Sequence, residues 1–500
     1  MDSLRLPAMG FGTMSGICGM AIPLLLMAHY IRNIFFHPLS GFPGPVTAAI
    51  TPLWISRIWN SGDYVFAIKE LHDKYGPVVR IAPNQVSFCS AASWRDIYGH
   101  VQAGQKPFLK SKFFYEAMPG ESENILTVGD PSIHARMRRN LSHGFSASAL
   151  SAQEGLVQGF INQLVQRLGE SPNDSKDMVT WLNMLTFDII GQLAFGESFG
   201  NLDRGKPHFW LEILFGSIEA LTFLRSFEYF APLRTFVRWV IGRDFLPASM
   251  TTELKRVKQY SCDQIEKRLR AGPQQADLLT RMLQKRKEDN VSFDELQAQA
   301  DVLILAGSET TATALSGILY YLCCNENVYE KLANEIRTAF QSYDEITSRS
   351  TEPLPYLQAV IEEGLRIYPP VPIGLPRVSP GRTVDDHYIP KGTIVHVSSW
   401  AATHSEMNFH KPLEFIPERW IDPECTDDKS ASRPFILGSR ACLGRNLAQL
   451  EMRLVLSKLL WVYDFALQDD TVDWISKHKT YVFWKKPDLW MKVTRREVQV

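Results

Sequence analysis

The stretch from Phe435 to Arg453, FILGSRACLGRNLAQLEMR, constrains the fold of this chain more than any other segment. After a single cysteine, leucines recur at helical spacing, which predicts a helix that begins at or just after Cys442. A helix N-terminus combines unpaired backbone N–H groups with the positive end of the peptide dipole. Because both favour an anion, we expect a lowered pKa at Cys442 and a stabilised thiolate.

The residues around this cysteine indicate what the thiolate would bind. Gly438 and Gly444 lack Cβ atoms, so a flat molecule could approach the backbone closely. Arg440 adds a cation that could pair with a carboxylate of that molecule. A flat, carboxylated partner with a thiolate ligand is a haem. The alternative is a buried structural cysteine in front of a helix.

The spacing F-x-x-G-x-R-x-C-x-G resembles the haem-binding loop of the cytochrome P-450 superfamily. This resemblance implies haem b (iron protoporphyrin IX) as the cofactor, with Cys442 as the axial ligand of its iron. It also implies that the rest of the motif binds the cofactor, namely Phe435, Gly438, Arg440 and Gly444. Together with the motifs below, the resemblance covers residues 35 to 495.

Composition fits a large globular protein and excludes some partners. The chain has 500 residues, of which 45% are hydrophobic and 21% charged, as expected for a large core. Lys and Arg number 53 against 54 Asp and Glu, so no nucleic-acid partner is expected. Seven dispersed cysteines favour a reducing compartment over a disulfide framework.

The N-terminus predicts a membrane anchor. Leu6 to Ala28 carries no charged residue and is about long enough to cross a bilayer. We expect an anchor at 1–31, a Pro/Gly-rich linker at 32–46 and a haem–thiolate catalytic domain at 47–500. A cleaved signal peptide is the alternative. Flanking charges do not set the orientation. The resemblance implies a catalytic domain on the cytosolic face of the endoplasmic reticulum membrane.

A long helix with misplaced polar residues is the second feature. Ser292 and Glu295 form a capping-box pattern, and no proline interrupts the helix before about Cys324. Its middle is apolar on every side and should be buried. Ser308 to Thr311 nevertheless places a carboxylate and hydroxyls there, which costs several kcal/mol unless they are paired or hydrated. We expect a functional site; a hydrated notch without chemistry is the alternative.

AGSETT (306–311) resembles the oxygen-activation motif of the same family. The resemblance implies that Thr310 assists dioxygen activation and proton delivery, with Glu309 as its acidic neighbour. HARMRR (134–139) resembles the segment that contacts a haem propionate, with His134 in an aromatic position and Arg138 at the matching arginine. By the same resemblance Arg377, in VPIGLPRV, reaches a propionate.

Glu363 and Arg366 are spaced three apart on a predicted helix. Such a pair alone is worth ~0.2–0.5 kcal/mol. Together with Pro417-Glu-Arg-Trp420, it resembles the E-x-x-R and P-E-R elements of the family. The resemblance implies a buried charge network of Glu363, Arg366 and Arg419 that holds the cysteine loop.

Three further segments carry structural expectations. Val78 to Phe88 reads as a hairpin, and residues 101–130 read as a loop over the site. Residues 209–247 are rich in aromatics interleaved with arginines. We expect this stretch to form a lipid-contacting roof, with ordinary core packing as the alternative.

These features predict a mainly α protein with small β-sheets (α+β), a cytochrome P-450 fold with haem between a long central helix and the cysteine loop. The implied activity inserts one oxygen atom from O2 into a lipophilic small molecule. HPLSGFPGP, HARMRRNLSHGF and FDIIGQLAFGESFG most resemble fungal microsomal members that tailor secondary metabolites (terpenoids, polyketides or alkaloids). Three alternatives remain: a haem–thiolate isomerase or dehydratase that does not use O2, a haem sensor, and a membrane scaffold without haem.

By the same resemblance, electrons would come from NADPH through a diflavin cytochrome P-450 reductase. An acidic partner of this kind would dock on a basic surface. The candidate cations for that surface are Arg136, Arg139, Arg445 and Arg453. The alternative for Arg136 and Arg139 is a solvated basic face.

Overall fold

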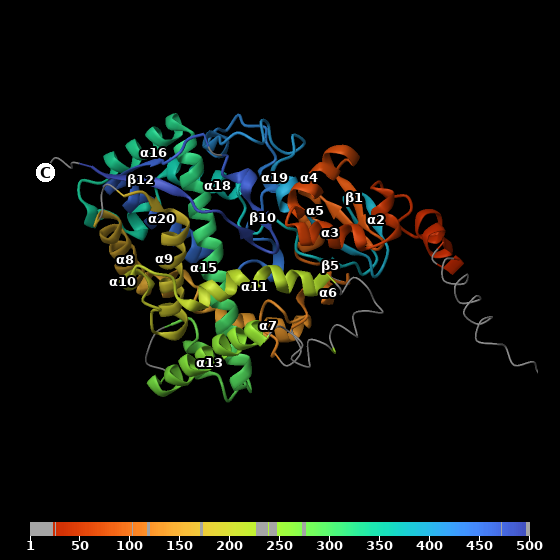
Figure 1. Cartoon of the computed structure of the whole chain (residues 1–500), viewed down its shortest axis with the longest axis horizontal. Helices are drawn as coiled ribbons and strands as arrows, with labels where there is room; N and C mark the ends of the chain where they lie inside the picture. The colour runs from red at the N-terminus through yellow and green to blue at the C-terminus, as the bar shows by residue number, and fades with distance from the viewer. Residues whose placement is uncertain are drawn as a thin grey trace, which may run out of the picture.

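The computed structural model describes residues 24–25, 27–102, 104–117, 121–170, 174–226, 239, 248–272, 277–471 and 473–496. Helix α15 (Phe293–Cys324) runs through the middle of the molecule, and the other long helices surround it (Figure 1). Those packed against α15 are α9 (Met178–Phe195), α13 (Ala248–Ala271), α16 (Glu326–Ala339), α18 (Pro355–Ile367) and α20 (Arg445–Val462). This arrangement confirms the expected mainly helical fold with small sheets.

The other α-helices are α2 (Val46–Ile50), α3 (Leu53–Ser61), α4 (Tyr64–Tyr75), α5 (Ala91–Tyr98), α6 (Lys112–Tyr115), α7 (Pro131–Ser142), α8 (Ala147–Gly169), α10 (Asn201–Arg204), α11 (Phe209–Ser226), α14 (Thr280–Gln284), α17 (Ser348–Thr351) and α19 (Ser399–Thr403). Short 3-10 turns are η3 (Tyr343–Glu345), η4 (Pro417–Trp420), η5 (Lys429–Ala431), η6 (Gly438–Arg440) and η7 (Ile475–Lys477), and η1 (Arg32–Phe36) is a π-helix.

The largest sheet has the strand order β1-β2-β8-β5-β3 and lies beside the helical part (Figure 1). Its strands are β1 (Val78–Ala82), β2 (Gln85–Phe88), β8 (Ile394–Val397), β5 (Arg377–Val378) and β3 (Leu109–Lys110). β2 and β8 are parallel, and the other pairs are antiparallel. Ala82 pairs with Gln85, which confirms the hairpin. The expected loop at 101–130 is wrong in part, because it contains β3 and α6.

Three smaller sheets complete the fold. They consist of β4 (Lys176–Asp177), β12 (Trp490–Arg495) and β9 (Tyr463–Leu467); β6 (Arg382–Val384) and β7 (His387–Ile389); and β10 (Lys479–Thr480) and β11 (Trp484–Lys485). The β10–β11 hairpin brings the C-terminal part of the chain back toward α15. Lys486, directly after β11, contacts that helix, as described below.

The long helix has the boundaries that its sequence predicts. The Ser292 hydroxyl accepts a hydrogen bond from the Glu295 N–H at 3.0 Å and caps the first turn. The second bond of the expected capping box is missing, because the Glu295 carboxylate pairs with Arg136 of α7 at 3.0 Å. By length and composition, α9 and α15 could each cross a membrane, but most of each helix is buried inside the fold.

The Pro/Gly-rich stretch packs against the sheet. Leu39 is fully buried, and the Arg80 N–H of β1 donates to the Pro43 carbonyl at 2.7 Å. The Arg80 guanidinium also reaches the Asn33 carbonyl at 2.9 Å. Residues 32–46 are therefore attached to the edge of the largest sheet. The predicted anchor lies outside the described residues up to position 23.

The aromatic segment divides into two environments. Trp210 packs on Phe187 and Phe199 in the core, which favours ordinary packing there. Phe223 and Trp239 have 52% and 48% of their surface exposed. Most of 227–247 lies outside the described residues, so the expected lipid-contacting roof stays a prediction.

A glycine sets the close approach of α15 to the chain at the end of α18. A Cβ added at Gly317 would overlap the ring of Tyr368, the residue directly after α18. Tyr368 is itself fully buried and stacks on Trp484. Because the ring cannot move aside, only glycine allows this helix contact.

We expect Gly317→Ala to lower the free energy of unfolding by about 1–3 kcal/mol through overpacking, measured by chemical denaturation. Gly155→Ala is the matched control, because Gly155 also lies in a helix but has open space around it. That variant should gain about 0.5–1 kcal/mol from helix propensity. Equal effects of both substitutions would show that the Tyr368 contact is not tight.

Candidate active site

Cys442 lies three residues before the first residue of α20, on a loop that its own N–H closes. That N–H donates to the Phe435 carbonyl at 2.8 Å. The cysteine is solvent-accessible, yet enough protein surrounds its sulfur for burial to act on it. The sulfur is thus surrounded by protein and still open to a bound molecule.

The expected low pKa of Cys442 is wrong for the chain by itself. Burial raises the pKa of this thiol above its ordinary value, although the N–H groups of Gly444 and Arg445 and the charge of Arg138 act in the opposite direction. The reason is that removing a thiolate from water costs more than the helix N-terminus returns. In addition, α20 begins at Arg445, three residues beyond the cysteine.

Gly438 is required for the packing of the cysteine loop. Its φ is +73°, which favours glycine, and a Cβ there would overlap the carbonyl of Tyr98. This glycine therefore lets the loop pack against the end of α5, and its expected role toward a flat ligand stays a prediction. A Cβ at Gly444 would meet only the Cys442 sulfur and Phe145, each at 3.9 Å.

One face of α15 is accessible in the middle of an otherwise buried helix. Ala306 is exposed and Thr310 is partly exposed, while Ile304, Ser308 and Ala312 are buried. The Thr310 hydroxyl donates to the Ala306 carbonyl at 2.6 Å, so both polar atoms lie on the accessible face. This face supplies the hydroxyl expected at Thr310.

Glu309 has other partners than those expected. The next residue on a helix lies about 100° around its axis, and the Glu309 side chain is 1% exposed. Its Oε1 accepts hydrogen bonds from Lys486 and from the Thr313 hydroxyl, the latter at 3.1 Å. Burial raises the pKa of Glu309, and Lys486 opposes that rise. The Glu309 carboxylate therefore forms an ion pair with Lys486, whereas the Thr310 hydroxyl donates to the Ala306 carbonyl.

The predicted propionate residues gather into one cationic cluster. Arg138 donates to the Ala441 carbonyl at 2.6 Å, and Arg440 to the Gly129 carbonyl at 3.0 Å. Arg377 donates to the Tyr115 hydroxyl at 2.9 Å. The cluster also contains His134, whose pKa is lowered to about 3 by burial, then by Arg440, Lys110, Arg138 and Arg377.

Within the described part of the chain, none of these cationic residues forms an ion pair with a carboxylate. A buried or partly buried group of cations without counter-ions is costly unless an anion binds there. Two carboxylates of a flat cofactor would supply that charge, with Cys442 as the ligand of its metal. The residues present therefore fit a haem.

Lys110 and Tyr115 belong to this cluster, and the sequence reasoning missed both. The two lie in β3 and α6, inside the stretch expected to be a loop. Lys106, Lys110 and Lys112 look alike in the sequence, but only Lys110 is buried. Its burial depends on strand pairing with a segment more than 260 residues away, which no local pattern encodes.

The three structural residues meet as the sequence suggests. Arg366 binds both oxygens of Glu363, each at 2.8 Å, and all three residues of the network are buried. Arg419 reaches the same carboxylate at 3.1 Å and also pairs with Asp427. Trp420 donates to Glu363 at 2.8 Å. Asp427 and Trp420 were not expected, and the proposed support of the cysteine loop stays a prediction.

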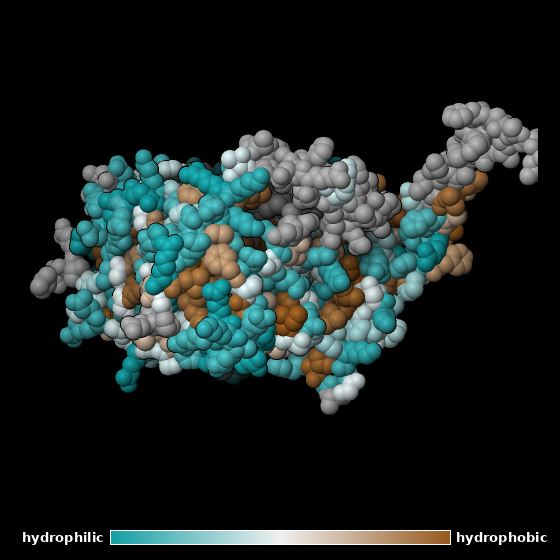
Figure 2. Space-filling view, turned by 90° about the horizontal axis from the view of Figure 1, so that it is seen from below, coloured by the Kyte–Doolittle hydropathy of each residue, from teal (hydrophilic) through white to brown (hydrophobic). Residues whose placement is uncertain are grey.

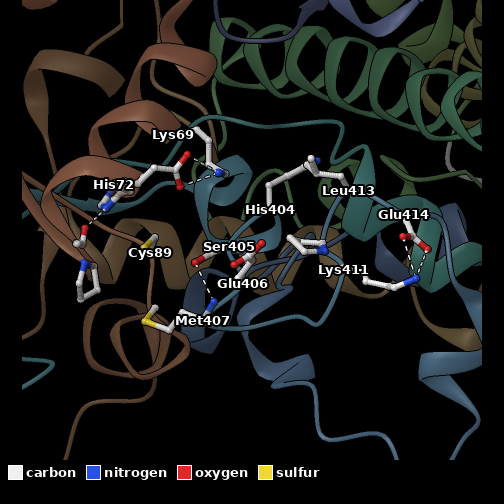
Figure 3. Close-up of a pocket in the computed structure, with 14 residues that line it drawn as sticks. Lys69, His72, Cys89, His404, Ser405, Glu406, Met407, Lys411, Leu413 and Glu414 are labelled. Atoms are coloured by element: carbon white, nitrogen blue, oxygen red, sulfur yellow. Dashed lines mark hydrogen bonds and ion pairs between the residues drawn. The ribbon is translucent and has the colours of Figure 1, made fainter.

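A surface pocket separate from the candidate site lies between α4 and the segment after α19 (Figure 3). No residue of the cysteine loop or of α15 lines it. Four of its charged residues are paired locally, Lys69 with Asp73 and Lys411 with Glu414. This pocket therefore shows no arrangement for chemistry.

The fold and the site together define a haem–thiolate type of protein, and comparisons with known proteins agree. The model of the family Cytochrome P450 matches residues 42–492. Cytochrome P450 monooxygenase ORF9 of Penicillium roqueforti (strain FM164) is 41% identical over 465 residues, which is 92% of this chain and 90% of that protein.

Two further relatives are similar over nearly their whole length. Cytochrome P450 monooxygenase BOT4 of Botryotinia fuckeliana is 41% identical over 480 residues, covering 95% of this chain and 90% of that protein. Cytochrome P450 monooxygenase aclL of Aspergillus oryzae (strain ATCC 42149 / RIB 40) is 40% identical over 486 residues, covering 96% and 97%. The chain belongs to the cytochrome P450 family and is a cytochrome P450 monooxygenase. Membership in the family implies haem.

The Glu309–Lys486 pair gives a prediction with a defined pH dependence. Lys486→Met leaves Glu309 buried without its cation, which should lower the free energy of unfolding by about 3–5 kcal/mol at pH 8. Burial raises the pKa of Glu309, and removal of the Lys486 charge takes away the main opposing influence, so the folded variant binds this proton more tightly than the unfolded chain does. The loss should therefore shrink as the pH falls toward 4.5.

Denaturation of both proteins at several pH values measures this dependence. Lys485→Met is the matched control, because Lys485 pairs with Glu219 at the surface and should change stability by less than about 1 kcal/mol. A loss for Lys486→Met that does not vary with pH would contradict the buried ion pair.

Proposed function

We propose that this monooxygenase inserts one oxygen atom from O2 into a lipophilic small molecule of secondary metabolism, of the terpenoid, polyketide or alkaloid class. The observation that carries the proposal is the accessible Ala306–Thr310 face on an otherwise buried α15. Three segments that resemble fungal microsomal members support the substrate class, as does the similarity to monooxygenases of three fungi.

Each residue of the site has a distinct task in this proposal. Bound haem would supply the iron that activates dioxygen, with a thiolate ligand increasing its electron density. Cys442 would hold the iron, and Arg138, Arg377 and Arg440 would bind the carboxylates. The Thr310 hydroxyl would hold a proton at Oγ1 on the accessible face. Glu309 could donate a proton there only after leaving Lys486.

For electrons, we propose NADPH and a diflavin reductase that docks on the basic surface near the start of α20. Arg139 and Arg445 are exposed and available to an acidic partner. Arg136 is engaged by Glu295, and Arg453 is only partly exposed. The proposed docking surface therefore centres on Arg139 and Arg445, two of the four arginines that the sequence suggests.

The proposed location is the endoplasmic reticulum membrane, with a single N-terminal anchor and the catalytic domain on the cytosolic side. Leu6 to Ala28 has no charged residue. Described residues between positions 24 and 36 include exposed apolar side chains, and Figure 2 shows brown side chains on the projecting N-terminal segment. The exposed apolar residues there are Leu24, Leu25, Met27, Ile31, Phe35 and Phe36.

Replacement of the proposed ligand tests the cofactor site. Cys442→Ala should abolish the thiolate signature in the absorption spectrum of the reduced carbon monoxide complex, because no other ligand replaces the sulfur. Cys324→Ala, which removes an exposed cysteine at the end of α15, should keep the signature. Retention of the spectrum by Cys442→Ala would contradict the ligand assignment.

Turnover with labelled dioxygen tests the reaction. With ¹⁸O2, NADPH and reductase, one product oxygen should carry the label, which neither an isomerase nor a haem sensor would give. Thr310→Ala should divert more NADPH to peroxide or water per product, because the hydroxyl that holds the proton is lost. Thr310→Ser keeps a hydroxyl and should restore coupling. Unchanged coupling in Thr310→Ala would rule out this role.

A further inference from the structure

Two cations face one another across a pair of strands in the propionate cluster. Lys110 of β3 is the direct partner of Arg377 of β5 in the antiparallel register. Directly opposite residues point to the same face of a sheet, and like charges in such a pair are destabilising. Both side chains are buried, with 8% and 4% of their surface exposed. Stability alone does not explain this pair.

The Lys110 ammonium is held by backbone carbonyls rather than by an acid. Its Nζ donates to the carbonyls of Ile125 at 2.9 Å and Leu126 at 2.7 Å. It also lies 5.3 Å from the centre of the Tyr115 ring. An ammonium has three donors, and among the described residues no acceptor is recorded for the third.

The surroundings of Lys110 favour an anion. Burial lowers the pKa of this amine to about 6, and the charges of Arg440 and Arg377 act in the same direction. The charge of Glu123 raises the pKa of Lys110, but this carboxylate is exposed and forms no ion pair with the amine. His134 and Tyr115, from α7 and α6, complete the groups around the amine. An anion bound here would offset the burial of several cations at once.

We propose that Lys110 binds a carboxylate of the cofactor, beside Arg377 and Arg440. This inference rests on the proposed haem site and adds a residue outside the motifs that predicted it. The interaction is a charge-assisted hydrogen bond with no covalent step. Because Lys110 also holds the carbonyls of Ile125 and Leu126, it connects the segment before α7 to the edge of the cofactor.

The test compares haem with haem dimethyl ester, in which both carboxylates are blocked. In the full-length protein, Lys110→Met should release haem about tenfold faster than wild type, as expected for loss of a hydrogen bond to a charged group. The release rate of the dimethyl ester should be the same in both proteins. The measurement is the transfer of each cofactor to apomyoglobin, followed by absorbance.

Two variants separate charge from structure. Lys112→Met removes an exposed cation two residues further on and should release both cofactors as wild type does. Lys110→Gln keeps an N–H donor for the carbonyls but no charge, so it should fold and still release haem faster, and it replaces Lys110→Met if that variant does not fold.

Each result has one meaning. Faster release of haem alone supports the proposal. Equal acceleration of haem and its ester would overturn it, because Lys110 would then only support the loop, and no change for either would overturn it as well. Failure of the wild-type protein to take up haem with a thiolate spectrum would instead refute the proposed function.

Discussion

The carboxylate of Glu363 is the centre of a buried network that fixes two distant parts of the chain to each other. It is fully buried and accepts hydrogen bonds from Arg366, Arg419, Trp420 and the Ile416 N–H. Removal of one member of such a network would leave buried charges without partners, at a cost of about 3–5 kcal/mol. Because the partners come from α18 and η4, one carboxylate fixes the helix to the segment that leads to the cysteine loop.

Two other groups of buried charge contrast with this network. Glu309 and Lys486 neutralise each other and attach the C-terminal hairpin to α15. The cations near Cys442 have no such carboxylate among the described residues. The paired groups therefore hold the fold together, whereas the unpaired cluster is suited to an anionic ligand. Burial of charge is costly in both groups. The structural residues have partners of opposite charge within the described chain, and the proposed binding residues do not.

Local patterns were sufficient for part of this structure. The boundaries of α15, the β1–β2 hairpin and the meeting of Glu363 with Arg366 follow from capping, turn residues and helical spacing. The partners of Glu309 and Lys110 could not be predicted, since Lys486 and Arg377 lie far away in the sequence. The pKa of Cys442 was misjudged because burial, unlike a helix N-terminus, leaves no mark in the local sequence.

Backbone carbonyls orient the cations near Cys442 without neutralising them, which carboxylates could not do. Arg138, Arg440 and Lys110 come from three different elements, and main-chain oxygens of Ala441, Gly129 and Leu126 position them. A carbonyl dipole orients a cation without cancelling its charge, whereas a carboxylate in the same place would neutralise it. The cluster thus stays positive and oriented, so that a carboxylated ligand would gain affinity from charges already fixed in position.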